Sequence, residues 1–564
     1  MLDLVIRNGT IVDGSGLPRY RGDVGVRDGR IASVGRLLGD VEAARVIDAA
    51  GKIVAPGFID PHTHYDAQLC FDPYAYPAIE HGVTTVITGN CSLSMAPVRA
   101  SHRERFSRMY RLIEEMPEAA FDLGVDWRWG ESFGGMLDSL AGDLALNVGA
   151  LVGHSVLRMY VLGEDPRRVA AADEVATMCE VLRACLDAGA LGLSTSYVDV
   201  EDDLLPVPCR FADHRELEAL CGVLAERGRM LQVVHEFYDA GLTVSRIEML
   251  ADLSMRFGIP TTLSPLFHSA AAPGGAEQVM AAVERVWAEG ARVWPQVQTR
   301  PIDISWTMGQ RSIMFLAIPG WWNVLAMNDP AAKLAALADP KVKEQLVAGM
   351  DQAVALRGPG MDPANYLVRD VALERNRDLV GRTLGDIAAE RGTCAAELLI
   401  DLSVEEDLGT WFMRAELGHS DRDAVGSLLA HPLVHIGASD GGAHVGSFAT
   451  YGDTGFLLSR YVRETGALSL EAAVKKITAD TAAIWDIPER GELRSGFAAD
   501  VVVFDADTVG RGPEVASHDF PGGGTRWIRR AEGVDTVIVN GAVTWTAADG
   551  YVDGARAGTI TSPA

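Results

Sequence analysis

Two histidines one residue apart follow an apolar run in KIVAPGFIDPHTH, residues 52–64. Residues i and i+2 of a strand point to the same side, so His62 and His64 can reach one object together. Imidazole nitrogens are common ligands of transition metals. The pair therefore indicates a metal site at a strand end, although a polar strand end without a metal would give the same pattern.

Further metal-binding side chains follow other short apolar runs. A cysteine follows VTTVITGN, single histidines follow MLQVV and TTLSPLF, and an aspartate follows VHIGAS. Imidazole, thiolate and carboxylate together favour Zn²⁺, with one ion held by the softer ligands and, as an option left open, a second, weaker one. The softer group is Cys91, His235 and His268, and the harder group is His62, His64 and Asp440.

Eight short β-branched or apolar runs, which include these sites, alternate with helical patterns such as 173–189 and 213–228. This alternation predicts an α/β fold, a (β/α)8 TIM-like barrel, whose active site lies at the carboxyl ends of its strands. The ordered ligands would then meet on one face. The runs are GFIDPHTH, VTTVITGNC, NVGALVGHS, ALGLSTS, MLQVVHE, TTLSPLFH, RVWPQVQT and VHIGASDGG.

Both ends of the chain contain alternating segments with Asn-Gly and Asp-Gly turn signals, such as LDLVIRNGTIVDG and VDTVIVNGAVTW. These signals predict a small β-sandwich domain built from residues 1–55 and 490–564, with the barrel over 56–489. Residues 301–430 are too long for a loop between strands 7 and 8 and predict an inserted subdomain, a lid or a pocket wall. Its Trp306, Trp321 and Trp322 would line an acyl pocket or pack a core.

The composition limits the partners. With 50 basic and 77 acidic residues, the net charge is −27, which disfavours binding to nucleic acid or anionic membranes. No signal peptide is visible, and no apolar run approaches the roughly 18 residues of a membrane span. Seven scattered cysteines favour the reducing cytoplasm over a disulfide framework. A small-molecule substrate is expected, and a homo-oligomer is left open.

The ordered ligands and three longer segments, TGNCSLSMAP, LVGHSVLRMYVLG and GALGLSTSY, carry a family resemblance. The chain resembles the amidohydrolase superfamily and, within it, the N-acyl-D-amino-acid deacylase (D-aminoacylase) family. Its fourth strand, ALGLSTS, has no lysine to bridge two metals, so Cys91 would replace that anion. The resemblance implies tight zinc at Cys91, His235 and His268, and a weaker position at His62, His64 and Asp440.

The resemblance implies hydrolysis of a linear amide, with Asp440 as the general base that moves a proton from water to the leaving nitrogen. Asp440 could instead be only a ligand or a turn cap. Arg300 is predicted to bind a substrate carboxylate, with His154 and Arg158 as further substrate contacts, although ion-pair or structural roles are the alternatives.

The chain also departs from the family pattern. SAAAPGG follows His268 without a lysine, and VWPQVQT replaces a Tyr-Pro-Tyr-like strand. The substrate is therefore left open between an N-acyl-D-amino acid and a cyclic amide, an unusual peptide or a natural-product amide. A non-catalytic scaffold is the remote alternative.

Overall fold

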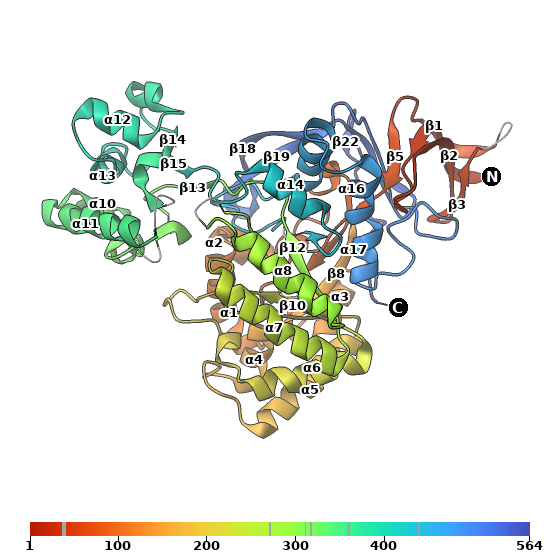
Figure 1. Ribbon diagram of the computed structural model, residues 1–564, viewed down its shortest axis with the longest axis horizontal. Coiled ribbons are helices and arrows are strands. Elements are labelled where there is room, and N and C mark those ends of the chain that lie inside the picture. The colour runs from red at the N-terminus through yellow and green to blue at the C-terminus, as the bar shows by residue number, and fades with distance from the viewer. Residues whose placement is uncertain are drawn as a thin grey trace.

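The computed structural model describes residues 1–36, 41–269, 272–310, 312–315, 318–357, 361–437 and 439–563 (Figure 1). Ala438, within the predicted eighth-strand segment, and residues 270–271, after His268, lie outside the described residues. Eight parallel strands lie side by side in chain order, which confirms the predicted barrel sheet. They are β6 (Phe58–Asp60), β7 (Val83–Thr88), β8 (Asn147–Gly153), β9 (Gly192–Ser196), β10 (Met230–Val234), β11 (Thr261–Ser264), β12 (Val293–Val297) and β16 (His435–Ile436).

Helices alternate with these strands and cover them, so strands such as β7, β8 and β10 are buried along their whole length. Local signals set the helix ends: Asp213 caps the first turn of α6 through the N–H of Glu216, and Gly228 ends it in a left-handed conformation. The covering helices are α4 (His154–Leu162), α5 (Ala172–Asp187), α6 (His214–Arg227), α7 (Ala240–Phe257) and α8 (Gly275–Ala288).

The remaining barrel helices lie in longer connections. Between β7 and β8 are α1 (Arg103–Ile113), α2 (Glu118–Gly124) and α3 (Phe133–Leu140). Next to β16 are α14 (Arg422–Ala430), α15 (Asp453–Phe456), α16 (Leu470–Lys476) and α17 (Ala479–Ile484).

The first and last strands are joined at their carboxyl ends. Thr63 and Gly441 form a parallel bridge, the N–H of His64 donates to Gly441 O at 2.8 Å, and the N–H of Asp440 donates to His62 O at 3.1 Å. This backbone contact places the segment of His62 and His64 directly against the segment of Asp440.

A nine-stranded sheet built from both ends of the chain confirms the predicted small β domain. The N-terminal part supplies β1 (Leu2–Ile11), β2 (Tyr20–Arg27), β3 (Arg30–Gly35), β4 (Ala43–Asp48) and β5 (Ile53–Pro56). The C-terminal part supplies β17 (Val501–Phe504), β20 (Val534–Val539), β21 (Ala542–Thr546) and β22 (Gly550–Tyr551).

Two strands of the C-terminal part do not join that sheet. β18 (Gly510–Phe520) and β19 (Gly524–Glu532) form a separate antiparallel ribbon. Arg526 on this ribbon donates to the hydroxyl of Tyr451 at 3.0 Å, and Trp527 packs edge-on against Trp411, with ring centroids 5.0 Å apart. The ribbon thus contacts both the barrel and the inserted subdomain.

The insertion between strands 7 and 8 forms a lobe of its own (Figure 1). It contains the antiparallel strands β13 (Ile304–Trp306), β14 (Leu367–Asp370) and β15 (Trp411–Arg414), with helices α9 (Trp321–Leu325), α10 (Pro330–Ala338), α11 (Pro340–Arg357), α12 (Leu384–Arg391) and α13 (Ala395–Glu405). Its separate hydrophobic core includes Trp306, Trp321 and Phe412. The packing alternative therefore holds for the first two of the three predicted tryptophans, whereas Trp322 is half-buried.

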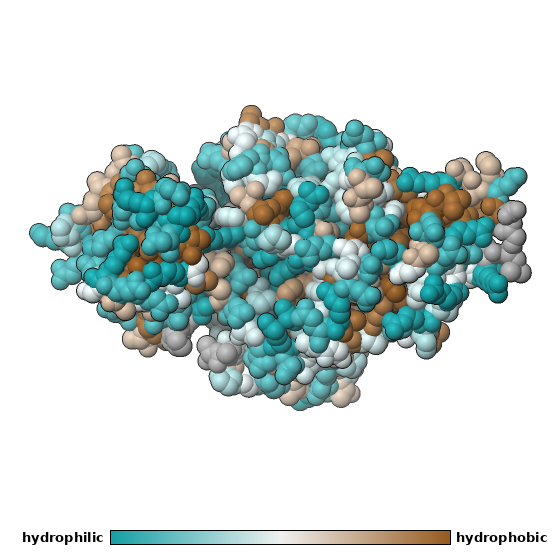
Figure 2. Space-filling model, turned by 90° about the horizontal axis from the view of Figure 1, so that it is seen from above, coloured by the Kyte–Doolittle hydropathy of each residue, from teal (hydrophilic) through white to brown (hydrophobic). Residues whose placement is uncertain are grey.

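The face of the molecule in Figure 2 is largely hydrophilic, in keeping with the net charge of −27. None of the helices in the described part of the chain combines the length and apolar character needed to cross a bilayer.

Candidate metal centre

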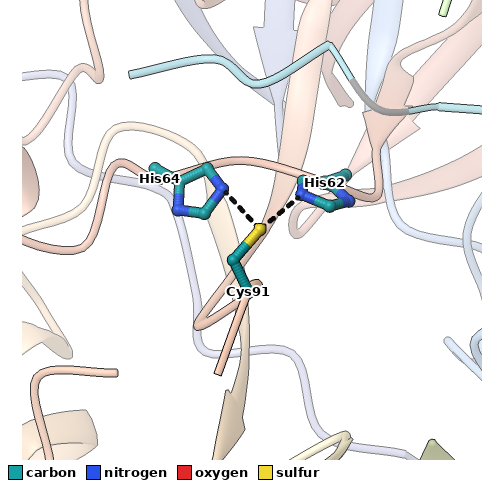
Figure 3. A group of neighbouring side chains, drawn as sticks. All are labelled: His62, His64 and Cys91. Atoms are coloured by element: carbon teal, nitrogen blue, oxygen red, sulfur yellow. Dashed lines mark hydrogen bonds between the residues drawn. The ribbon is translucent and has the colours of Figure 1, made fainter. Parts of the chain in front are cut away.

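Four of the predicted ligands meet at the joined strand ends. His62 Nε2 lies 3.3 Å and His64 Nε2 lies 3.4 Å from Cys91 Sγ, and Figure 3 shows the two rings facing the sulfur. Asp440 Oδ1 lies 3.3 Å from His62 Nε2 and 3.6 Å from His64 Nε2. Two imidazoles, a thiol and a carboxylate therefore converge, a donor set that suits Zn²⁺.

Hydrogen bonds between the two loops fix this arrangement. The Asn90 amide donates to Thr63 O at 3.3 Å and to Ile87 O at 3.0 Å, so the loop of Cys91 is tied to the loop of the histidines. Cys91 and Asp440 both have left-handed backbones, with φ of 54° and 60°. Such a conformation costs a non-glycine residue about 1–2 kcal/mol and is characteristic of functional sites.

A side-chain oxygen lies close to the second nitrogen of each histidine, in hydrogen-bond contact with His62 and at ion-pair distance from His64. His62 Nδ1 lies 3.0 Å from Gln296 Oε1, and His64 Nδ1 lies 3.0 Å from Glu114 Oε1. Each Nε2 is thereby directed at Cys91 and Asp440. Sequence reasoning missed both partners. The signals were an acidic pair at the end of a helix, Glu114 and Glu115, where the helix dipole disfavours acids, and Gln296 within the unusual VWPQVQT strand.

Burial and charge set the protonation states of the group. Burial lowers the pKa of His62 to about 4, and burial raises the pKa of the Cys91 thiol. Burial also acts to lower the pKa of His64, but the negative charge of Glu114, together with contacts to Cys91 and Asp440, outweighs it and raises that pKa well above its usual value. For Asp440, burial is outweighed by His64 and His62, which lower its pKa. Asp440 is therefore ionised at neutral pH.

His235 and His268 need separate description. Among the described residues, His62, His64 and Cys91 form a group whose ligand atoms all lie within 4.8 Å of one another, and Asp440, His235 and His268 are not members of it. His235 is fully buried, and neither of its ring nitrogens has a hydrogen-bond partner in the described part of the chain. Burial lowers its pKa to about 4. A buried imidazole without partners is costly unless it binds something, so His235 fits a metal ligand.

The predicted substrate contacts have partners within the protein. Arg300 Nε lies 2.7 Å from Asp453 Oδ1, and its Nη2 donates to Ser439 O at 2.5 Å, next to Asp440. This geometry favours the ion-pair alternative, with Arg300 bracing the loop of Asp440.

His154 and Arg158 share a buried partner on α6. His154 Nε2 lies 2.8 Å from Glu216 Oε1, and its Nδ1 lies 3.0 Å from Thr195 Oγ1. The guanidinium of Arg158 forms an ion pair with the same carboxylate. All three are almost fully buried, which favours the structural alternative over substrate contact for both predicted residues.

A cavity of about 660 Å³ lies beside the centre, within the size range of small-molecule sites. Its walls come from α1 and the residues after it, from the insertion and from the loop after Asp440. The four converging residues do not line it. Its link to them is through neighbours in the sequence: Glu115 lines the cavity and follows Glu114, the partner of His64. The wall includes Arg111, Glu115, Met116, Trp306, Gly446 and Ser447.

Known proteins are similar to this chain in sequence and in fold. The sequence model of a protein family described as "Amidohydrolase family" matches residues 45–545 of the chain. An N-acyl-D-glutamate deacylase of Alcaligenes xylosoxydans xylosoxydans is 30% identical over 555 residues, with 96% of this chain and 94% of that protein covered. A D-aminoacylase of the same organism is 29% identical, with 96% and 94% covered. The crystal structure of N-acyl-D-glutamate deacylase from Bordetella bronchiseptica, complexed with zinc and a phosphonate inhibitor, is 28% identical with a TM-score of 0.68, over 100% of this chain and 99% of that one.

Proposed function

Belonging to the amidohydrolase family, the chain is a metal-dependent amide hydrolase, and we propose that it removes the acyl group from N-acyl-D-amino acids. The convergence of His62, His64, Cys91 and Asp440 at the barrel mouth carries the proposal. The substrate class is supported by the similarity to two deacylases along nearly the whole chain.

The ligand assignment is part of the proposal. Cys91, His235 and His268 hold Zn²⁺ tightly, and His62, His64 and Asp440 hold a weaker position. The contacts of Cys91 Sγ with both His62 and His64 suit a ligand shared between the two positions. The partner-free nitrogens of buried His235 supply uncommitted donors for the tight position.

When bound, zinc would lower the pKa of a water molecule and polarise the substrate carbonyl. The protein's own part is proton movement: Asp440 takes a proton from the water whose oxygen attacks the amide carbon. It then returns this proton to the nitrogen as the C–N bond breaks, which yields a carboxylic acid and an amine. The lowered pKa of Asp440 leaves its carboxylate ready to accept that first proton.

The cavity beside the centre is the proposed substrate pocket. Most of its lining residues are polar or charged, which suits the amide and carboxylate of a substrate, and the apolar Met116 and Trp306 lie in its wall at 3% and 1% exposure. Arg111 in its wall pairs with Glu118 at 2.8 Å, and the Glu118 side chain is 75% exposed. A substrate carboxylate can displace such an exposed partner at little cost, because surface ion pairs contribute only about 0–1 kcal/mol. Arg111 thus becomes the proposed carboxylate anchor in place of Arg300.

The cysteines bear on the cellular compartment in which the enzyme works. All seven cysteines are free in the structure. Because free thiols suit a reducing environment, we place the enzyme in the cytoplasm.

A substrate panel tests the proposed reaction. Zinc-loaded protein is offered N-acyl-D-amino acids, their L-enantiomers, hydantoins and lactams, and release of free amine or ring opening is followed. Release of amine from D-substrates in preference to L-substrates supports the proposal. Ring opening without any deacylation would contradict it and favour a cyclic-amide hydrolase.

A further inference from the structure

We propose that Glu114 is a positioning residue that strengthens the hold of His64 on a metal ion, and that Gln296 supports His62 more weakly in the same way. The inference rests on the proposed role of the two histidines as metal ligands. It goes further by assigning two residues that do not themselves contact the metal.

The geometry around the two histidines is parallel. His64 Nδ1 lies 3.0 Å from Glu114 Oε1, and His62 Nδ1 lies 3.0 Å from Gln296 Oε1. In both rings the other nitrogen, Nε2, faces Cys91 and Asp440. Gln296 is in hydrogen-bond contact with His62, whereas Glu114 lies at ion-pair distance from His64 without hydrogen-bond geometry, so its influence on His64 is mainly through its charge.

The two supporting oxygens differ by a full charge. Glu114 is 1% exposed and Gln296 is 0% exposed, so neither is screened by solvent. A buried carboxylate at this distance from Nδ1 makes the imidazole a stronger electron donor. It also favours a positive charge at the opposite ring nitrogen, Nε2. The Coulomb energy of a divalent ion near this carboxylate is about twice that of a proton at the same place. The carboxylate therefore favours the metal over the competing proton.

The location of Glu114 is explained poorly by folding alone. It directly follows α1, so its charge stands at the helix C-terminus, where the dipole disfavours acids. Within the described residues, its ion pair is the one with His64, and it has none with an arginine or lysine. Its backbone carbonyl accepts from the N–H of Val445 at 3.3 Å, which anchors the helix end to the loop after Asp440. A buried carboxylate held in this way is costly unless a cation compensates it.

The test compares Zn²⁺ affinity in the wild type, Glu114→Gln and Glu114→Asp, by competition with a chromophoric chelator. Glu114→Gln keeps the shape and an oxygen but removes the charge. It should weaken the most loosely held Zn²⁺ about 10–100-fold, the usual cost of losing a partner behind a ligand. Glu114→Asp keeps the charge but withdraws it by one methylene, so an intermediate loss is expected. Glu374→Gln, at an 88% exposed side chain, is the matched control and should leave the affinity unchanged.

A second experiment moves the negative charge from behind His64 to behind His62. In the double variant Glu114→Gln, Gln296→Glu, the charge lies behind His62, and part of the lost affinity should return. Absorption of the thiolate–cobalt bond in Co²⁺-loaded protein should persist in all variants that keep Cys91 in the site. Equal affinity of the wild type and Glu114→Gln would overturn the inference. A wild-type protein that binds no Zn²⁺ would instead contradict the proposed function itself.

Discussion

At the residue scale, Asp440 combines the two properties that a general base of this centre requires. Its carboxylate is held ionised by His64 and His62. Its side chain is 28% exposed, whereas those of the two histidines are 2% exposed, so solvent reaches its carboxylate more readily than either imidazole. Asp440 can therefore exchange protons with a water that attacks a substrate.

Replacing Asp440 with Asn should lower kcat by about 10²–10⁴-fold, the usual contribution of a positioned base, because the amide cannot accept the proton. Turnover of the best substrate under saturating Zn²⁺ measures the effect, with circular dichroism as a check on folding. Asp165→Asn, at a 71% exposed side chain, is the control. Near-normal turnover by the Asp440 variant would reduce this residue to a turn cap or a dispensable ligand.

The two proposed metal positions predict an order of zinc loss. Cys91→Ala removes the ligand assigned to the tight position, whereas His64→Asn touches only the weaker one. Zinc content after gel filtration, measured by mass spectrometry, should therefore fall further in Cys91→Ala. The reverse order would overturn the division of ligands.

The types and order of the converging residues were predictable from the sequence because each follows a short apolar run. Their partners were not. Glu114 lies 23 residues beyond Cys91, and its contact with His64 depends on where α1 packs. The grouping of Cys91 with His235 and His268 stays a prediction, and the contacts of its sulfur with His62 and His64 were not predicted.

At the element scale, α16 anchors the segment that leads into the eighth strand. Lys476 at its end is 9% exposed and donates to His431 O at 2.7 Å and Val434 O at 3.0 Å, just before β16. Burial lowers the pKa of Lys476 from 10.5 to about 8. The helix thus holds β16, and with it the loop of Asp440, through a buried amine.

This pKa predicts a pH dependence of stability. Between pH 8 and 10.5 the unfolded chain binds more protons at Lys476 than the folded chain does, so the wild type gains stability as pH rises. Relative to Lys476→Met, its thermal midpoint should therefore increase from pH 7.5 to 9.5. A difference that stays constant or falls over this range would contradict the lowered pKa.

The barrel strands and the two-ended sheet were predictable because apolar or alternating runs between turn signals identify strands locally. The β18–β19 ribbon was not distinguished from the rest of the C-terminal part. Its place is set by tertiary contacts such as those of Arg526 with Tyr451 and Trp527 with Trp411, which no local sequence signal announces.

At the scale of the whole molecule, the inserted lobe supplies one wall of the cavity beside the metal centre. Its core is separate from that of the barrel, yet Trp306 both packs in this core and lines the cavity. The sequence predicted the insertion from its length and left open whether its tryptophans line a pocket or a core. Trp306 does both.

Filling the cavity should weaken substrate binding without affecting the metal. Gly446 lines it, and a Cβ built there meets nothing closer than 3.6 Å, so Gly446→Leu can extend into the space without straining the backbone. KM should rise about tenfold, because the leucine and the substrate would compete for the same volume, and overpacking costs about 1–3 kcal/mol. Gly222→Leu on α6 is the control, and zinc content should stay constant in both variants. Unchanged KM in Gly446→Leu would place the substrate elsewhere.

Zinc-dependent restoration of deacylation shows whether catalysis depends on the centre of His62, His64, Cys91 and Asp440. Protein stripped of metal is titrated with Zn²⁺ while amine release from an N-acyl-D-amino acid is followed, in the wild type and in Cys91→Ala. Turnover should be absent at the start, return in the wild type with the first equivalents of Zn²⁺, and stay absent in Cys91→Ala. Full turnover by the stripped wild type, or equal restoration of the two proteins, would contradict catalysis at the centre formed by His62, His64, Cys91 and Asp440.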